Sequence, residues 1–485
     1  MTQEYIDFHA AERPDDAAII DNGRSIPYAE FARDIRKVIR ALRALELPRG
    51  AKAAIDRGSP YFDWLLRLAF EQLRIVTVTV GIPDTPDALT LVRDFDIVLS
   101  HKSLPAGGAP RTHLVPTAWL RDVLANGEED AEPALETQPD DPIRIVLTSG
   151  TTGRPKTLLY TRRVHDASIN KTLWFGGFTA RSRYLLALHQ TVAGPTACIR
   201  AGGTVVIEER IPQAEAIATH GITHTTLPPF TLKRILDDLP PDFAKPADLT
   251  ILSFGAGISK ALRERALARL ATDVCDMYSA NEVGWVSSIS GTAEIGTIWP
   301  SVRVEVVDAH DRPLPFGEVG EIRVQTDYML HAYLDYPEAQ GRIFKDGWFY
   351  PGDVGILHEP GRLEVIGRSN DVLNIGWRKV APEVIEDMVR EAVEVTDVGA
   401  VSIPNADGIE EVCVAVVRPS VGDEELLRRV TATFRGTQLG RVHVIRVPAI
   451  PRTPNGKLQR KVLKDTVSQA IRQKASAKPD DRPSR

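Results

Sequence analysis

The sequence has few cysteines, no excess of basic residues and no long apolar run. Its three cysteines, Cys198, Cys275 and Cys413, are too far apart for a metal knuckle or a disulfide framework, which favours buried thiols in a reducing compartment. With 59 Lys+Arg against 65 Asp+Glu, the net charge of -6 gives no basic surface for nucleic acid. No window approaches the roughly 18 apolar residues of a membrane span, and the first residues lack the pattern of a secretory signal. We therefore expect a cytoplasmic protein that neither inserts into membranes nor binds nucleic acid.

The features that are present predict a chain of several domains in the α/β class. At 485 residues and 43% hydrophobic content, the chain exceeds one ordinary domain. Apolar residues at three- and four-residue spacing predict a helix from Tyr28 to about Leu45. The acidic, proline-bearing stretch 126–142 predicts a solvent-exposed connector. Short β-branched runs predict strands that alternate with helical segments, as in α/β folds: 74–83, 143–148, 204–209, 223–228, 249–257 and 302–308.

The pattern changes after residue 368, where a smaller α+β unit is expected. A short strand, a helix and two further strands follow one another. We therefore predict a large N-terminal unit over 1–368 and a small C-terminal unit over 369–470. Residues 471–485 are polar and contain proline, so we expect a disordered tail there. The helix of the small unit should bury one apolar stripe: Val384, Ile385, Met388, Val389 and Ala392.

The segment TSGTTGRPK, residues 148–156, contains hydroxyls, glycines and a lysine but no apolar side chain. It follows a predicted strand, and ligands of α/β sheets bind beyond the carboxyl ends of strands. Its glycines permit a sharp turn close to a ligand, its hydroxyls and amides donate hydrogen bonds to phosphate oxygens, and Lys156 adds a positive charge. It is no Walker loop, because Arg154 and Pro155 separate the glycine from the lysine. The segment is either a plain surface turn or a polyphosphate-binding loop.

This segment is similar, residue for residue, to the phosphate-binding motif of the adenylate-forming superfamily. That superfamily comprises acyl- and aryl-CoA synthetases, adenylation domains of nonribosomal peptide synthetases and beetle luciferases, and the acyl and aryl acid ligases resemble the chain most. The resemblance implies that Thr152 and Lys156 assist catalysis. It also implies an ATP-binding set in this loop: Thr148, Ser149, Gly150, Thr151, Thr152, Gly153 and Lys156.

Two further segments resemble motifs around the adenine and the metal. DMYSANEVG, 276–284, resembles the family's Tyr-Gly-x-Thr-Glu segment, which implies that Tyr278 packs on the adenine and that catalytic Glu282 ligates Mg²⁺. Just upstream, SFGAG, 253–257, resembles the glycine-rich strand end that lines the adenine pocket. The resemblance therefore adds nucleotide contacts: Gly255, Ala256, Gly257, Asp276, Met277 and Ser279.

The ribose motif follows in the family's order. DGWFYPGDVGIL, 346–357, resembles the segment whose aspartate accepts both ribose hydroxyls, which would be Asp353. A carboxylate suits this role because its two oxygens can each accept a hydrogen bond from a diol. The intervening stretch 317–339 also follows the family, with Ala332 where glycine is usual, and we expect it to be structural.

The last two motifs concern the small unit. GRSND resembles the family hinge, in which Arg368 reaches the nucleotide and Asn370 with Asp371 absorb a rotation of the small unit. PRTPNGKLQRKVL resembles the final motif, whose lysine, Lys457, enters the active site as a catalytic and nucleotide-binding group.

The resemblance implies an enzyme that joins a carboxylic acid to a thiol. Attack of the acid on the α-phosphate of ATP, assisted by Mg²⁺, would give acyl-AMP and pyrophosphate. No general base is needed, because a carboxylate is already ionised at neutral pH. The acyl group would then pass to the pantetheine thiol of CoA or of an acyl carrier protein.

The residues around AGGTVV concern the choice of acid. Asp and Glu are absent from 185 to 207, so the carboxylate with which peptide synthetases hold an amino-acid ammonium is missing. A small, neutral pocket suits a fatty or aromatic acid. Its walls are expected from His189, Val192, Ala193, Gly194, Thr225, Thr226, Leu227 and Gly255.

Departures from the family concentrate in the second half-reaction. In NIGWRKVAPEVIE, Trp377 replaces a glycine where the pantetheine arm would enter, and Val384 replaces a glutamate. The indole either narrows the tunnel or packs on the large unit. The segment 434–447 lacks the usual prolines. The alternatives are a ligase with a non-CoA acceptor, or a nucleotide-binding homologue without catalysis.

Overall fold

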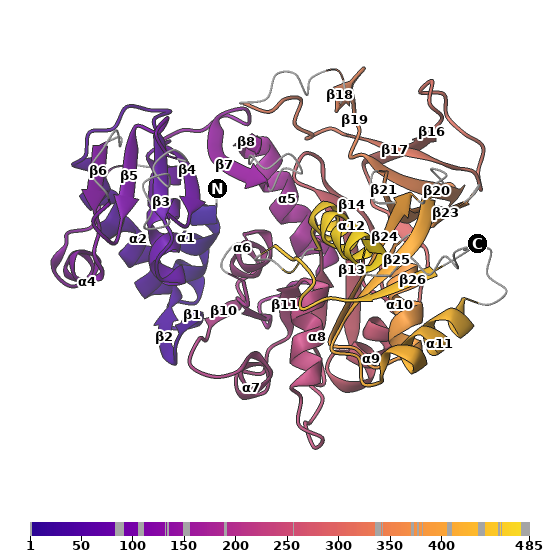
Figure 1. Ribbon diagram of the computed structural model, residues 1–485. Coiled ribbons are helices and arrows are strands. Elements are labelled where there is room, and N and C mark those ends of the chain that lie inside the picture. The colour runs from indigo at the N-terminus through magenta and orange to yellow at the C-terminus, as the bar shows by residue number, and fades with distance from the viewer. Residues whose placement is uncertain are drawn as a thin grey trace, which may run out of the picture.

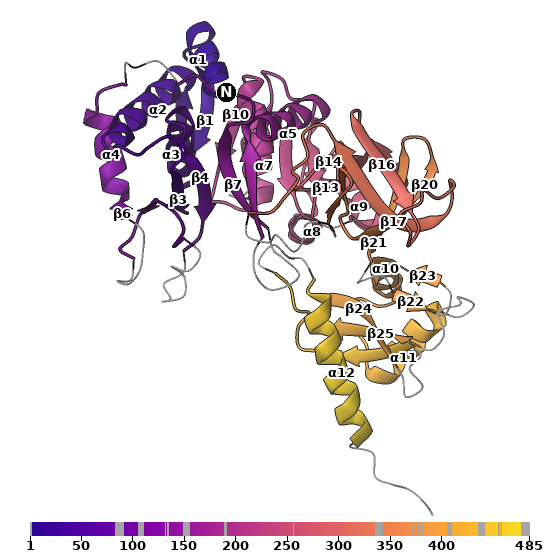
Figure 2. The same ribbon diagram turned by 90° about the horizontal axis from the view of Figure 1, so that it is seen from above.

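The computed structural model describes most of the chain and shows a large unit followed by a smaller one (Figure 1, Figure 2). Strand β21 (Arg362–Arg368) ends the large unit, and the next strands form separate sheets. The described residues are 2–82, 92–104, 111–130, 132, 135–148, 156–188, 192–255, 257–334, 341, 343–369, 373–375, 378–380, 382–404, 410–434, 442–453, 456 and 458–476.

The first sheet of the large unit has six strands in the order β6-β5-β3-β4-β7-β8. Apolar side chains cover both of its faces, because successive residues of a strand point to opposite sides. Ala53 and Ile55 face the core with the helices, whereas Ala54 packs with Val78 and Ile145 on the other side. Its strands are β3 (Lys52–Asp56), β4 (Val76–Val80), β5 (Ile97–Ser100), β6 (Arg111–Leu114), β7 (Pro142–Thr148) and β8 (Lys156–Thr161).

The helices of this first half explain why the sheet is buried. The helix predicted from Tyr28 is α2 (Tyr28–Arg43), and its apolar stripe, including Phe31 and Ile35, is completely buried. With α3 it contributes to the same core as β3. The helices are α1 (Thr2–Glu12), α2, α3 (Pro60–Gln72) and α4 (Thr117–Asn126).

The second sheet of the large unit continues from parallel strands into antiparallel ones. Strands β9 to β13 pair in parallel, and β14 turns back against β13. Its strands are β1 (Ala17–Asp21), β2 (Arg24–Pro27), β9 (Arg183–Leu185), β10 (Thr204–Ile207), β11 (His224–Leu227), β12 (Thr250–Ser253), β13 (Asp273–Ala280), β14 (Gly284–Ile289), β15 (Gly296–Ile298), β16 (Val302–Val307), β17 (Val319–Thr326), β18 (Phe344–Lys345), β19 (Trp348–Phe349), β20 (Asp353–Glu359) and β21. Its helices are α5 (Arg162–Phe175), α6 (Ala193–Arg200), α7 (Gln213–Thr219), α8 (Pro229–Asp237) and α9 (Lys260–Arg269).

The small unit packs helices on a three-stranded sheet, as Figure 2 shows. The stripe predicted on α10 is wrong at one position, since the side chain of Val384 is 53% exposed. Ile385 and Val389 are buried, and Val384 lies about 100° away from Ile385 around the helix. The elements are β22 (Leu373–Ile375), β23 (Arg378–Val380), α10 (Pro382–Ala392), β24 (Asp397–Pro404), β25 (Glu410–Val417), α11 (Asp423–Thr433), β26 (Val442–Arg446) and α12 (Arg460–Ser476).

Two other predictions need correction. The connector 126–142 is largely exposed where it is described, but Asp130 is only 8% exposed and accepts a hydrogen bond from Arg43 at 2.5 Å. The tail predicted from residue 471 is helical as far as Ser476, because α12 continues through good helix formers. Residues 477–485 lie outside the described part.

Two expectations from composition agree with the structure. The three cysteines are buried and none forms a disulfide. Among the described residues, no helix is both long and apolar enough to cross a membrane. The mixed α/β class of the large unit is also as predicted.

Candidate active site

The predicted nucleotide residues come from ends of strands in both sheets. Thr148 pairs with Lys156 in the antiparallel β7–β8 ladder, so the phosphate-type loop joins these two strands. Its residues Ser149, Gly150, Thr151, Thr152 and Gly153 lie outside the described residues.

A buried carboxylate lies at the start of β20. Asp353 is 5% exposed and stands opposite Arg368 in the β20–β21 ladder. Tyr278 Oη donates a hydrogen bond of 2.5 Å to Asp353 Oδ2, and Arg368 Nε lies 3.0 Å from Asp353 Oδ1. Burial, together with the adjacent carboxylate, raises the pKa of Tyr278 well above its ordinary value. The phenol is therefore protonated, and both carboxylate oxygens are held in place.

A second carboxylate, Glu282, lies on the turn after β13. Its side chain is 9% exposed, and Tyr333 Oη donates a hydrogen bond of 2.6 Å to Glu282 Oε1. Lys156 Nζ lies 4.7 Å from the centre of the Tyr333 ring, over its face. Burial lowers the pKa of Lys156, with Glu282 opposing and Arg368 reinforcing that shift. Arg368 thus pairs with Asp353 and also acts on the charge of Lys156. We therefore treat the two carboxylate clusters as one candidate site.

The glycine-rich end of β12 borders this site. Ser253 is the register partner of Asp276 on β13, and Asp276 Oδ2 accepts the Ile258 amide at 3.0 Å. Gly255 has φ +87°, a backbone conformation that favours glycine, and a Cβ added at Gly255 or Gly257 would meet nothing within 4 Å. Burial raises the pKa of Asp276 to about 6. The strand end is therefore held by a carboxylate and faces open space.

The other predicted β13 residues differ in burial. Met277 is buried in the core of the large unit, whereas Ser279 is half-buried beside Tyr278. The side chain of Met277 thus packs in the interior, and any nucleotide contact there falls to the backbone.

The predicted acid pocket is only partly brought to this edge. Thr225 Oγ1 donates to the Leu185 carbonyl at 3.1 Å, and Leu227 lies in the core beside α8, so both serve packing. Thr226 is 4% exposed at the end of β11. Val192 and Ala193, where α6 begins, are half-buried, and Gly194 packs so closely on Tyr184 that a Cβ would lie 2.7 Å from its ring.

Several predicted site residues lie outside the described residues: His189, Ala256, Asn370, Asp371, Trp377 and Lys457. The two flanks of the Lys457 loop are described. Arg452 pairs with Asp397 at 2.8 Å and donates to the Gly456 carbonyl at 2.8 Å. Arg460 Nη1 lies 2.6 Å from Glu386 Oε1. The residues on both sides of Lys457 in the sequence are thus anchored to the small unit.

Tyr333 was not predicted as a site residue, although this tyrosine contacts both Glu282 and Lys156. This tyrosine lies in the stretch 317–339, which was expected to be structural. Its signal was an aromatic residue in a polar segment, which is too common to single out.

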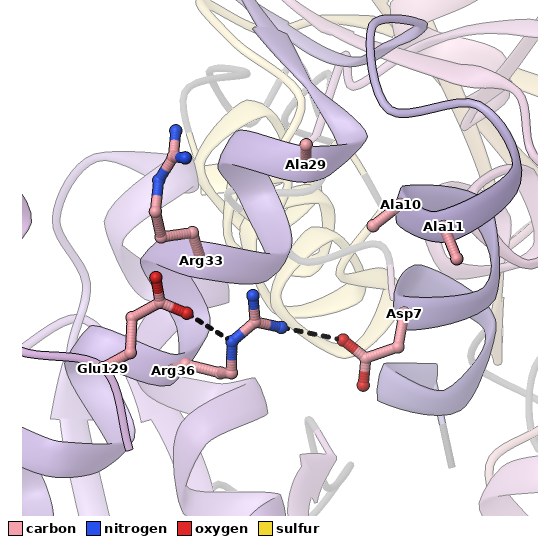
Figure 3. Close-up of a pocket in the computed structure, with 7 residues that line it drawn as sticks. All are labelled: Asp7, Ala10, Ala11, Ala29, Arg33, Arg36 and Glu129. Carbon is pink, nitrogen blue, oxygen red and sulfur yellow. Dashed lines mark hydrogen bonds and ion pairs between the residues drawn. The ribbon is translucent and has the colours of Figure 1, made fainter. Parts of the chain in front are cut away.

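Two surface hollows formed by described residues lie away from this site. The one in Figure 3, of about 480 Å³, lies between α1 and α2, where Arg36 pairs with Asp7 at 3.2 Å and with Glu129 at 2.7 Å. A second, of about 290 Å³, lies beside β16 and includes Phe316. None of the predicted site residues lines either hollow.

Comparisons with known proteins identify the family. A family model described as AMP-binding enzyme matches residues 74–334. The fatty acid–[acyl-carrier-protein] ligase ScoC of Streptomyces coeruleorubidus is 27% identical, over 94% of this chain and 95% of that protein. A salicylyl-CoA synthase / salicylate adenylyltransferase of a Streptomyces species is 30% identical, over 67% of this chain and 62% of that protein. The crystal structure of ATP-bound MatB from Rhodopseudomonas palustris, 22% identical, aligns with a TM-score of 0.84 over 97% of this chain and all of that one.

The chain therefore belongs to the AMP-binding enzyme family, the adenylate-forming enzymes whose motifs it displays. Its architecture of a large N-terminal and a smaller C-terminal unit is that of these enzymes. The predicted class, an AMP-forming acid–thiol ligase, is confirmed at this level.

Proposed function

We propose that this chain activates a fatty or aromatic carboxylic acid as its acyl-AMP and then transfers the acyl group to a pantetheine thiol. The observation that carries the proposal is a pair of carboxylate clusters, Tyr278–Asp353–Arg368 and Glu282–Tyr333–Lys156, in which the charge of Arg368 acts on Lys156. Motifs far apart in the sequence supply their members.

The first cluster suits the nucleoside. Asp353 offers two oriented oxygens to the ribose diol once its present partners yield them, and Tyr278 lies beside it with an aromatic face for the adenine. Arg368, 44% exposed, keeps a positive charge at the mouth of the site for the phosphates. The open space beside Gly255 admits the base.

The second cluster suits the triphosphate. Glu282 is a hard oxygen ligand, and one or two carboxylates with phosphate oxygens are the usual protein contribution to a Mg²⁺ site. The metal would offset phosphate charge when bound. Lys156 and the loop 149–155 would hold the β- and γ-phosphates, and Lys457 would join the acid carboxylate to the α-phosphate. These cations lower the repulsion between the two reacting anions.

The acid and the acceptor follow from the relatives and from the pocket. A relative that aligns along nearly its whole length is named for a fatty acid and a carrier protein, and another for salicylate and CoA. The lack of Asp and Glu from 185 to 207 agrees with an apolar acid. We propose a carrier protein or CoA as the acceptor.

The test is pyrophosphate exchange with fatty, aromatic and amino acids. We expect exchange with one fatty or aromatic group and none with amino acids. Exchange driven best by amino acids would contradict the substrate class, and no exchange at all would contradict catalysis.

The acceptor is tested separately by offering CoA, a holo carrier protein and an amine to purified acyl-AMP. Thioester formation with Trp377 intact would exclude a blocked tunnel. Transfer to the amine alone would favour the non-thiol alternative, and Trp377→Gly should then restore thioester formation.

A further inference from the structure

Three basic side chains of the large unit are not members of the two nucleotide clusters. They are Arg67 on α3, Arg144 on β7 and His165 on α5, and we refer to them as the interior cluster. The charge of Arg144 lowers the pKa of both Arg67 and His165, so the three lie within electrostatic range of one another. None of them has a place in the adenylation chemistry described above.

The interior cluster has donors without acceptors. Arg144 Nη1 and His165 Nδ1 are buried and have no hydrogen-bond partner, and His165 as a whole is 8% exposed. Among the described residues, neither Arg67 nor Arg144 forms an ion pair. A buried donor left unpaired destabilises the folded state, and a charged one does so more strongly. Such a cost in a folded protein calls for a partner.

Burial makes the charge of this cluster unfavourable. It lowers the pKa of Arg67 to about 9 and that of Arg144 to about 10, although both remain protonated at neutral pH. Burial also lowers the pKa of His165 to about 3, so its imidazole is neutral. A neutral imidazole can still donate one hydrogen bond through Nδ1.

The nearby carboxylates do not neutralise the cluster. Asp166 is held by Arg200 at 2.5 Å and by Arg162 at 3.3 Å. Burial and the charge of Asp166 raise the pKa of Glu71, which disfavours its ionised form. Among the described residues, Glu71 forms no ion pair with Arg67 or Arg144.

Part of the interior cluster is in contact with solvent. Arg67, Arg144 and Tyr160 are only half-buried, whereas neighbours such as Leu158 are completely enclosed. Tyr160 is the register partner of Arg144, and Lys156 is that of Thr148. Because every second residue of a strand shares a face, Arg144 and Tyr160 lie on the same face of β7–β8 as Lys156.

We propose that the interior cluster is an anion-binding site, which takes a small oxyanion or a carboxylate between Arg67, Arg144 and His165. The anion has two possible sources, a free inorganic oxyanion or a second carboxylate on the acid substrate. If the anion is inorganic, the proposal is independent of the proposed function. If the anion is a second carboxylate of the acid substrate, the proposal rests on that function. The two sources share one chemistry, and experiment separates them.

The first arm measures thermal unfolding of the full chain against sulfate, with MgATP saturating so that the triphosphate site is filled. We expect the wild-type midpoint to rise saturably by a few degrees, because an anion that binds only the folded state stabilises it. Arg144→Met should lose this rise, and Arg163→Met, an exposed arginine of α5 paired with Asp140, should keep it.

The second arm measures pyrophosphate exchange with monocarboxylic acids and with dicarboxylic acids of equal length. If the substrate supplies the anion, the wild type should prefer a dicarboxylic acid by about tenfold or more. Arg144→Met should remove that preference and leave the monocarboxylic acids unaffected.

The proposal fails if sulfate raises the midpoints of the wild type, Arg144→Met and Arg163→Met equally and no acid changes its KM by more than about twofold. Arg67→Met provides a second variant if Arg144→Met does not fold. Loss of all exchange in the wild type would contradict the proposed function instead, and the sulfate arm would still decide the anion site.

Discussion

Two buried carboxylates with arginine partners illustrate how similar pairs differ in role. In the large unit, Asp353 pairs with Arg368, whose side chain is 44% exposed. In the small unit, Glu386 pairs with Arg460, whose side chain is 10% exposed. Glu386 also accepts the Ala400 amide at 3.0 Å, and Arg460 donates to the Ala400 carbonyl at 2.9 Å.

The difference lies in what each arginine could do next. Arg368 stands at the surface of its site and could move from Asp353 to a phosphate. Arg460 is enclosed and also pairs with Glu383, so it fixes the start of α12 against α10 and β24. We therefore expect the exposed pair to exchange with a ligand and the enclosed pair to stabilise the small unit. Five predictions test this contrast.

Breaking the enclosed pair should have the largest effect. Arg460→Met leaves Glu386 buried with the Ala400 amide as its remaining partner, and removal of one member of a buried ion pair costs about 3–5 kcal/mol. Denaturant unfolding of the small unit should show this loss. Arg429→Met, from a surface pair on α11, is the control and should stay near wild type. Equal stability of the two variants would contradict a structural role for Arg460.

Lys457, which lies between Arg452 and Arg460 in the sequence, should affect the rate of adenylation. Lys457→Ala should lower acyl-adenylate formation by about 10²- to 10³-fold, the scale of one lost transition-state donor. Pyrophosphate exchange measures it, with Lys461→Ala on α12 as the control. Exchange at the wild-type rate would remove Lys457 from the mechanism.

Breaking the open pair should affect the nucleotide more than the fold. Arg368→Met should raise the KM for ATP by about tenfold to a hundredfold, the range for a hydrogen bond to a charged group. Its unfolding free energy should change by no more than about 1 kcal/mol, because Arg368 is exposed and Tyr278 still donates to Asp353. Arg362→Met, on the same strand, is the control. A large stability loss with unchanged KM would make both pairs structural.

The pH dependence of stability tests a third buried carboxyl group, that of Asp276. The pKa of Asp276 is raised from 3.8 to about 6 in the folded protein, so its stabilising contribution is complete below about pH 4 and is lost as the pH rises through 6. Asp276→Asn should therefore flatten the stability profile between pH 4 and 7 by about 1–2 kcal/mol, allowing for partial exposure. Thermal unfolding without nucleotide measures it, and parallel profiles would contradict the raised pKa.

The smallest effect is expected at Tyr333. Tyr333→Phe removes the hydrogen bond to Glu282 but keeps the ring beneath Lys156, so kcat/KM for MgATP should fall by about two- to tenfold. Tyr350→Phe, whose hydroxyl bonds Asp311 at 2.9 Å away from the site, is the control. An unchanged Mg²⁺ dependence would leave Tyr333 without a role at Glu282.

Much of the fold was predictable because the periodicity is strong. The apolar stripe of α2 was compatible only with a helix, and the β-branched run of β4 only with a strand. The burial of Val384 was predicted wrongly, because adjacent apolar residues on a helix do not show where its buried face ends. The elements that pack against the helix decide which of these residues are buried. The helix continuing past residue 471 was missed because polar composition alone does not distinguish an exposed helix from a coil.

Motifs in the sequence singled out Tyr278, Glu282 and Asp353, which the structure places in two neighbouring carboxylate clusters, and their roles toward a nucleotide stay predictions. Tyr333 carried no such signal, since one tyrosine in a polar stretch has many uses. Arg67, Arg144 and His165 were equally unremarkable in sequence, separated by tens of residues and without a shared motif.

By itself, the sequence determined the family, because the motifs that mark it are short local patterns of residue types at fixed spacing. Only the tertiary structure decided which charges find partners. Pairing depends on distance, burial and exposure between strands and helices that are remote along the chain, and no local pattern encodes those quantities.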